Sequence, residues 1–262
     1  MYIDVHCHLT DEEDFASVGG VDSVIKSAIS AGIERIICSG YDLDSSIRAK
    51  ALADAYENVY FCAGFHPSEL GKYKEGDLSK IKDLCQSEKC VAVGEIGLDY
   101  HFENNPEKAF QKELFIKQLA LANELGLPVV LHSRDSAGDT YELLAQNKSL
   151  LSAGGLMHCY SYSAEMAERF LSLGLYFSFG GPCTFKNANK VYESVKRIPA
   201  HRILSETDCP YLTPVPFRGA FPNEPKYIPH IVKRFSELLE KDEERIKTEI
   251  YENAKRLFFK LK

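Results

Sequence analysis

The first residues able to do chemistry lie near the N-terminus, where His6 and His8 are two residues apart in the segment from Tyr2 to His8. In an extended strand alternate side chains share a face, so both imidazoles point to the same side as Asp4. Two imidazoles in this arrangement can chelate one cation. On this segment alone, two unrelated histidines in a polar N-terminus are an equally good interpretation.

Four further ionisable residues stand at the ends of later apolar segments: Glu95, His132, His158 and Asp208. Buried ionisable groups are costly unless they are paired or bound to a metal, so this recurrence favours a common site. A carboxylate flanked by imidazoles is a typical bridge between two cations, and we expect Glu95 to have that role. The set predicts a binuclear centre, and its nitrogen and oxygen ligands suit Zn, Mn, Mg, Co or Ni.

The elements that must position these residues are short apolar segments that alternate with longer amphipathic ones. The expected strands are Tyr2–His6, Ile33–Cys38, Val59–Ala63, Val91–Glu95, Pro128–His132, Gly155–His158, Leu175–Phe179 and Arg202–Ser205. The expected helices are Val21–Ala31, Leu43–Tyr56, Leu78–Cys85, Pro106–Leu125, Asp139–Ala145, Ala164–Leu173, Asn187–Val195, Ile228–Glu240 and Glu243–Leu261.

Eight strands that alternate with helices indicate parallel β-α units of the α/β class. In this length they predict a closed (β/α)8 TIM barrel, with a doubly wound open sheet as the alternative. We expect one domain over residues 1–262, because no linker or change in composition divides the chain. In a barrel the carboxyl ends of all strands meet at one mouth, which brings the histidines and carboxylates together.

Composition limits the classes of function. The formal net charge of -7 excludes a generic polyanion binder that relies on overall charge, so attraction to nucleic acid has to come from a local site. The 8 cysteines are scattered without a CxxC pair, and no signal-peptide pattern or long apolar run is present. We therefore expect reduced thiols, a cytoplasmic location and no association with a membrane.

Six motifs in this order resemble the TatD-like metal-dependent hydrolases over essentially the whole chain. They are His6-Cys7-His8, Gly64-Phe65-His66-Pro67, Gly94-Glu95-Ile96-Gly97-Leu98-Asp99-Tyr100, Leu131-His132-Ser133-Arg134, Met157-His158-Cys159-Tyr160-Ser161 and Glu206-Thr207-Asp208-Cys209-Pro210-Tyr211-Leu212. The resemblance implies an amidohydrolase-like barrel and a metal-dependent hydrolase, as in the deoxyribonucleases of this family.

The resemblance also implies the ligand set and the substrate. It places His6, His8 and Asp208 on one cation, His132 and His158 on the other, and Glu95 between them. Two divalent ions per subunit, Mg, Mn or Zn, are then expected as cofactors. The implied activity is hydrolysis of DNA phosphodiester bonds, as an exonuclease on single strands or 3′ ends, by a monomer.

Two cations about 3.5–4 Å apart can clamp a phosphodiester and make water nucleophilic at neutral pH. We expect Asp208 to orient the attacking water and take its proton. His66 and Arg134 lie in motifs that border the site. Arg134 offers a planar charged donor for phosphate, and His66 donates to another oxygen or protonates the leaving group. The alternative for Arg134 is a surface ion pair with Asp135 or Asp139.

Several neighbours of these residues receive lesser roles. Glu206 shares a face with Asp208, and we expect it to orient a ligand rather than to bind metal. Asp99 and Tyr100 are expected to be structural loop residues. Asp4 lies deeper in the barrel than the two histidines, and Cys7 packs on its outer layer.

The last loops contain the expected contacts to DNA. The cationic candidates are Lys186, Lys190, Arg218 and Lys226, and the aromatic ones are Phe185, Tyr211 and Phe217. Aromatic side chains can stack on bases, but more often such a ring simply packs a loop onto the barrel, and that is the favoured interpretation for any one of them.

Two departures from the family pattern leave the substrate open. The family has two residues between its Arg-Gly and Asn-Glu-Pro motifs, whereas three residues lie between Arg218-Gly219 and Asn223-Glu224-Pro225 here. In addition, Tyr162 follows Ser161 where the family has glycine. Both departures lie beside the ligands rather than among them. A hydrolase of a small amide or ester, and a binding protein that retains a metal site without turnover, are therefore the alternatives.

Overall fold

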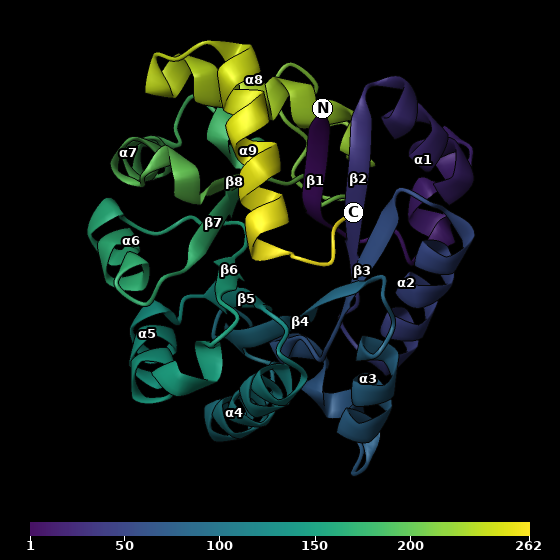
Figure 1. Ribbon diagram of the computed structural model, residues 1–262, viewed down its shortest axis with the longest axis vertical. Helices are drawn as coiled ribbons and strands as arrows, with labels where there is room; N and C mark the ends of the chain where they lie inside the picture. Colours follow the sequence, from purple (N-terminus) through teal and green to yellow (C-terminus); the bar gives the residue numbers. More distant parts are fainter.

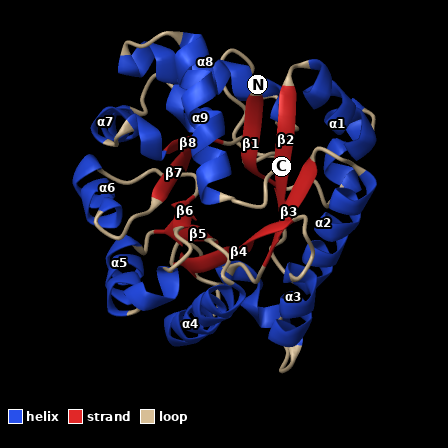
Figure 2. Cartoon of the chain, in the orientation of Figure 1, coloured by secondary structure: helices blue, strands red, loops and turns tan.

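The computed structural model describes residues 1–262 and contains one eight-stranded sheet in the order β1 to β8, each strand parallel to the next (Figures 1 and 2). The strands are β1 Tyr2–Cys7, β2 Ile33–Ser39, β3 Val59–Ala63, β4 Cys90–Asp99, β5 Val129–Arg134, β6 Gly155–Met157, β7 Tyr176–Phe179 and β8 Ile203–Ser205. The sheet curls into a barrel, which confirms the predicted (β/α)8 fold over the open-sheet alternative.

Helices α1 to α8 surround the strands in Figure 1. The α-helices are α1 Gly20–Ser30, α2 Leu43–Ala55, α3 Asp77–Cys85, α4 Lys108–Leu125, α5 Ala137–Gln146, α6 Ala164–Leu171, α7 Asn189–Arg197, α8 Ile228–Leu239 and α9 Glu243–Leu257. Short 3-10 helices are η1 Glu12–Val18, η2 Pro67–Lys72, η3 Lys148–Leu151, η4 Gly181–Thr184, η5 Ala200–Arg202 and η6 Pro225–Tyr227. None of the helices has the length and apolarity needed to cross a membrane.

The strands are buried because both of their faces are covered. Every residue of β3 and β4 is buried, as in a parallel sheet with helices outside and packed side chains within. The apolar residues of the strands and of the inward faces of the helices form one continuous core. The polar residues at the carboxyl ends of the strands therefore sit on a rigid base.

The barrel closes between β1 and β8 through bonds at the carboxyl ends of the two strands. The backbone N–H of Asp208 donates to the carbonyl of His6 at 3.0 Å, and the N–H of His8 donates to the carbonyl of Cys209 at 2.7 Å. The first and last segments of the barrel are thereby placed in register. This register brings Asp208, more than two hundred residues away in sequence, beside the two N-terminal histidines.

The side chain of Asp4 supplies the rest of this closure. Asp4 is fully buried, and its carboxylate accepts hydrogen bonds from the backbone N–H of Thr207 at 3.0 Å and from the Thr207 hydroxyl at 2.5 Å. The N–H of His6 also donates to it, at 3.3 Å. The Asp4 side chain thus supplies part of the hydrogen bonding that backbone groups alone would provide between two regular strands.

Strand β4 is longer than predicted, because it continues past Glu95 to Asp99 and pairs with β5 as far as Arg134. Gly97 makes this continuation possible. Its φ is +148°, and a Cβ there would lie 1.9 Å from the carbonyl oxygen of His132. The close approach of the two backbones requires glycine and carries Asp99 to the mouth of the barrel.

The C-terminal elements cover the opposite end of the barrel. The side chain of Asn253 on α9 donates to the carbonyls of Ala200 and Ile203, where β8 begins. The final residue, Lys262, bonds to Arg35 and Tyr60 near the starts of β2 and β3. In Figure 1 α9 accordingly crosses in front of the strands. The carboxyl ends of the strands lie at the other end of the barrel.

Candidate metal centre

The six predicted ligands converge at the carboxyl end of the barrel, although they come from five strands. His6 and His8 end β1, Glu95 lies in β4, His132 in β5, His158 follows β6, and Asp208 follows β8. All of them except His6 line a pocket of about 460 Å³, together with His66, which follows β3. His6 is fully buried beneath the pocket floor.

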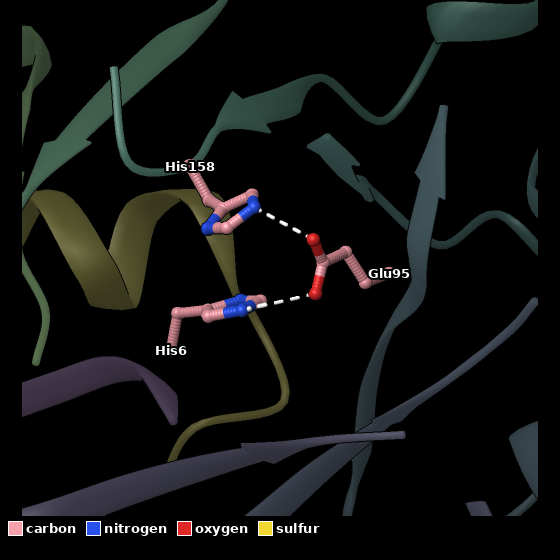
Figure 3. Close-up of side chains that lie close together, drawn as sticks. All are labelled: His6, Glu95 and His158. Atoms are coloured by element: carbon pink, nitrogen blue, oxygen red, sulfur yellow. Dashed lines mark ion pairs between the residues drawn. The ribbon is translucent and has the colours of Figure 1, made fainter. Parts of the chain in front are cut away.

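Glu95 lies at the centre of this group (Figure 3). Its Oε2 is 3.2 Å from Nε2 of His6 and 3.5 Å from Nε2 of His8. Its Oε1 is 2.7 Å from Nε2 of His158 and 2.8 Å from Nδ1 of His132. Burial opposes ionisation of Glu95, but the surrounding imidazoles outweigh burial and hold the pKa of its carboxyl well below the usual range.

The first potential ligand group combines His6 and His8 with Asp208. The two Nε2 atoms are 3.3 Å apart, and Oδ1 of Asp208 is 3.6 Å from the first and 3.5 Å from the second. Three such atoms around a common point, with Glu95 Oε2 beside them, are a suitable donor set for one divalent cation.

The second potential ligand group faces the other oxygen of Glu95. Nδ1 of His132 and Nε2 of His158 are 3.2 Å apart, and each lies within 3 Å of Oε1. The two groups therefore share a single carboxylate, with one oxygen directed at each.

Hydrogen bonds on the far side of the rings indicate that nitrogen lone pairs face the centre. Nδ1 of His8 is 3.1 Å from the carbonyl oxygen of Ser39, which can only accept, so the Nδ1 atom carries the proton and Nε2 is free. Nε2 of His132 is 3.2 Å from Oδ2 of Asp99, which leaves its Nδ1 free in the same way. The donor chemistry of the site therefore fits bound cations.

His66 has the opposite arrangement. The backbone N–H of Ser68 donates to its Nδ1 at 3.2 Å, so the proton of the neutral ring is on Nε2, which points to Oε1 of Glu95 at 3.4 Å. Burial and the neighbouring His132 lower the pKa of His66 to about 3. His66 is therefore suited to donate a hydrogen bond as a neutral ring, and unsuited to acting as an imidazolium acid.

Asp99 is a site residue that the sequence analysis assigned to a structural loop. It is buried, its Oδ2 contacts His132, and its Oδ1 accepts from the backbone N–H of His101 at 2.8 Å. Extending the alternation of β4 past Glu95 would have found it, since Glu95, Gly97 and Asp99 share one face of a strand. Tyr100 does have a structural role, because its hydroxyl donates to Asp139 at 2.8 Å.

We expect Asp99→Ala to weaken divalent-cation binding about 10- to 100-fold, because His132 would lose the acceptor that orients its ring and fixes its tautomer. Asp99→Asn keeps an oxygen that can face Nε2 and should weaken binding less. Titration calorimetry of the metal-stripped protein with Zn²⁺ or Mn²⁺ measures the effect. Equal affinities for wild type and Asp99→Ala would show that His132 needs no such support.

Glu206 lies behind His158, but no hydrogen bond joins the two side chains, so its expected role in orienting a ligand stays a prediction. Its carboxylate accepts from the Ser178 hydroxyl at 2.5 Å and from the backbone N–H of Cys159 at 2.6 Å. Its Oε2 is 3.9 Å from Nδ1 of His158, a buried nitrogen without a hydrogen-bond partner. Burial raises the pKa of Glu206 to about 8, despite the opposing effect of His158.

Arg134 is the one predicted catalytic residue that does not line the pocket. It is exposed, and its guanidinium lies over the ring of Phe102 at 5.0 Å. The alternative of an ion pair with Asp135 or Asp139 is wrong, since these pair with other residues. Asp135 pairs with His101 at 2.8 Å, and Asp139 pairs with Lys112 at 2.7 Å.

The loop residues proposed for DNA contact differ in their surroundings. Phe217 stacks on Tyr227 at 4.7 Å, and Arg218 lies over Phe185 at 4.1 Å, so these aromatic rings pack within the loops. Lys226 pairs with Glu224, and Lys186 and Lys190 are exposed. Tyr211 differs, because it is exposed and lines the pocket.

Comparisons with known proteins agree with this geometry. Residues 3–259 match the family described as TatD related DNase. The chain is 43% identical over 258 residues to YabD of Bacillus subtilis, which is named as an uncharacterized metal-dependent hydrolase. The match covers 98% of this chain and 99% of the relative. The chain is also 33% identical to a protein of Cronobacter sakazakii named 3'-5' ssDNA/RNA exonuclease TatD, over 91% of this chain and 92% of the relative.

A solved structure shows the same architecture. The crystal structure of YjjV, a TatD homolog from Escherichia coli, superimposes with a TM-score of 0.91 and 31% identity, over 98% of both chains. The family match covers nearly the whole sequence, and the potential ligand residues meet at the mouth of the barrel. The chain therefore belongs to the TatD family and is a metal-dependent hydrolase.

Proposed function

We propose that this hydrolase cleaves phosphodiester bonds of DNA, as an exonuclease on single strands or 3′ ends, with two divalent cations of Mg, Mn or Zn. The observation that carries the proposal is Glu95, whose two oxygens face two separate groups of imidazoles. A shared carboxylate of this kind is suited to a pair of cations, and paired cations are characteristic of phosphoryl-transfer enzymes. The relative named as a single-stranded DNA and RNA exonuclease supports the substrate class.

In this proposal His6, His8 and Asp208 hold one cation, His132 and His158 hold the other, and Glu95 contacts both. Bound divalent cations supply Lewis acidity toward the phosphodiester and lower the pKa of water. The histidines present their free nitrogens because Ser39 and Asp99 bind the opposite sides of the rings.

In this proposal Asp208 orients the attacking water and accepts its proton. Burial opposes ionisation, but His8 at 3.5 Å together with His158 and His6 keeps the pKa of Asp208 below its usual value. The carboxylate is therefore ionised at neutral pH and acts as an acceptor. His66, as a neutral donor through Nε2, binds a phosphoryl oxygen rather than protonating the leaving group.

Arg134 lies at the rim of the site rather than in the pocket. Its guanidinium is held by the face of Phe102 and by no ion pair, so it is available to a phosphate of a strand that extends beyond the pocket. We also propose that residues 1–262 act as one domain and as a cytoplasmic monomer.

The test is an assay of metal-stripped protein, reloaded with Mg²⁺, Mn²⁺ or Zn²⁺, on end-labelled single-stranded and duplex DNA. Wild type should shorten the strands, with single strands or 3′ ends preferred, and Glu95→Ala should be inactive. Model amide and ester substrates are assayed in parallel. Inactivity of both proteins on DNA under every metal, with turnover of an amide or ester by wild type, would reject the nuclease.

Cation binding should release protons at pH 7. Burial opposes charge on His158, but the Glu95 carboxylate at 2.7 Å outweighs burial and raises the pKa of His158 to about 10 in the metal-free protein. A cation binds only the unprotonated ring, so it must displace this proton, and affinity must rise with pH. Calorimetry in buffers of different ionisation enthalpy should detect about one proton or more released per protein; heats independent of the buffer would contradict this.

A further inference from the structure

Two exposed aromatic rings lie side by side at the edge of the pocket. Tyr211 and Phe221 are each 57% exposed, and their ring centroids are 6.4 Å apart. Tyr211 also lines the pocket that contains the candidate metal centre. The pair therefore extends the wall of the pocket outward as a continuous aromatic surface.

The loop that carries this pair is tied to the barrel. Asn223 is fully buried, and its side-chain amide donates to the carbonyls of Thr207 at 2.9 Å and Tyr211 at 2.6 Å. Its backbone N–H donates to the carbonyl of Pro210 at 2.8 Å. The segments that contain Tyr211 and Phe221 are thus joined just outside β8, so a ligand would lose little free energy in ordering them.

The neighbouring aromatic rings of the same region already have packing partners. Phe217 stacks on Tyr227 and is 41% exposed, and Phe185 lies beneath Arg218. Phe221 belongs to the three-residue stretch between Gly219 and Asn223, where the family pattern has two residues. The extra residue thus falls in the segment that holds the second exposed ring.

Carboxylates lie beside the aromatic pair. Asp11 and Asp14 line the pocket together with Tyr211; Asp11 pairs with Arg48 at 3.2 Å, and Asp14 has no such partner. Burial, followed by these two carboxylates, raises the pKa of the Tyr211 phenol. An aromatic surface beside a carboxylate suits a planar uncharged group with polar N–H edges better than it suits a phosphate.

We propose that Tyr211 and Phe221 form a base-stacking subsite for a single-stranded nucleic acid whose scissile phosphodiester lies at the metal centre. The inference rests on the proposed function and specifies how the substrate is held. A base can stack on an aromatic ring regardless of its identity, so the subsite selects for unpaired bases rather than for sequence. A duplex keeps its bases stacked within the helix and cannot use this surface.

The first test compares Tyr211→Ala and Phe221→Ala with wild type on a single-stranded oligonucleotide and on the same strand with abasic residues near its 3′ end. We expect each variant to raise KM for the normal strand about five- to a hundredfold. The abasic strand should show the same KM with all three proteins. Tyr211→Phe, which keeps the ring, should resemble wild type.

Phe259→Ala is the matched control. Phe259 is 58% exposed, close to the value for Phe221, but lies in the C-terminal segment at the opposite end of the barrel. Its substitution should leave KM unchanged on both strands. Equal KM values for wild type and the two alanine variants on the normal strand would overturn the proposal, and so would an equal rise on the abasic strand.

A binding measurement separates this inference from the proposed function. A phosphorothioate strand with 2-aminopurine near its 3′ end should lose fluorescence on binding wild type, and Tyr211→Ala and Phe221→Ala should bind it five- to a hundredfold more weakly, in line with the kinetic effect. Binding with quenching but without cleavage of normal strands would reject the nuclease and retain the subsite. Cleavage by wild type with no quenching would reject the subsite alone.

Discussion

Glu95→Gln should lower the activity of the hydrolase by on the order of a thousandfold, and the protein should no longer retain two cations. The substitution preserves the shape of the side chain but removes its charge. The oxygens of Glu95 lie 2.7–3.5 Å from nitrogen atoms of the four potential histidine ligands, two at each oxygen, and His66 is a fifth histidine at 3.4 Å. An amide presents only one oxygen, and its NH₂ group cannot bind a cation, so at least one of the two groups loses its shared ligand.

Metal content after dialysis, measured by mass spectrometry, and turnover on a DNA strand together test this expectation. Asp77→Asn is a suitable control, because Asp77 is a buried carboxylate on α3 that bonds to Lys74 and Lys80 and does not line the pocket. It should keep full activity and metal content. If Glu95→Gln retained two cations and a tenth of wild-type activity, Glu95 would not be the bridge.

Asp4→Ala should lower the free energy of unfolding by about 3–5 kcal/mol, since it leaves buried donors of Thr207 and His6 without an acceptor. It should also reduce activity, because Asp4 helps to align the strand of His6 and His8 with the segment of Asp208. Asp4→Asn keeps an acceptor oxygen, and the Thr207 hydroxyl can accept from its amide, so its cost should be about 1 kcal/mol. Urea unfolding measures both values.

A substitution of Asp77, here to alanine, supplies the comparison, because this buried aspartate bonds only to Lys74 and Lys80 at the start of one helix. We expect Asp77→Ala to cost about 1 kcal/mol and to leave turnover unchanged. If Asp4→Ala cost no more than Asp77→Ala, backbone bonds alone would suffice to close the barrel between β1 and β8.

The fold could be predicted because its signals are local. Eight short apolar segments separated by amphipathic ones indicate parallel β-α units, and the bounds of most helices agree within a few residues. The predicted fourth strand ended too early, at Glu95, because the glycines at 94 and 97 are typical of a turn. Gly97 is instead required by the close approach of β5, a contact between strands that no local pattern contains.

Residue types and their positions at strand ends were enough to select the six potential ligands, because a parallel barrel brings all carboxyl ends to one mouth. The sequence could not assign the hydrogen-bond partner of each imidazole ring. That assignment depends on hydrogen bonds between distant segments: Ser39 with His8, and Asp99 with His132. The position of Asp99 on the face of Glu95 follows from strand alternation, but its bond to His132 does not.

The sequence by itself determined the class of fold, the family and the location of the site, since each follows from periodicity or from motifs within single segments. Only the tertiary structure decided which oxygen of Glu95 faces which imidazoles, that Asp4 joins β1 to the segment after β8, and that Arg134 lies outside the pocket. The physical reason is the same in each case. The direction of a side chain depends on which neighbours, remote in the chain, fill the space around it, and only packing sets those neighbours.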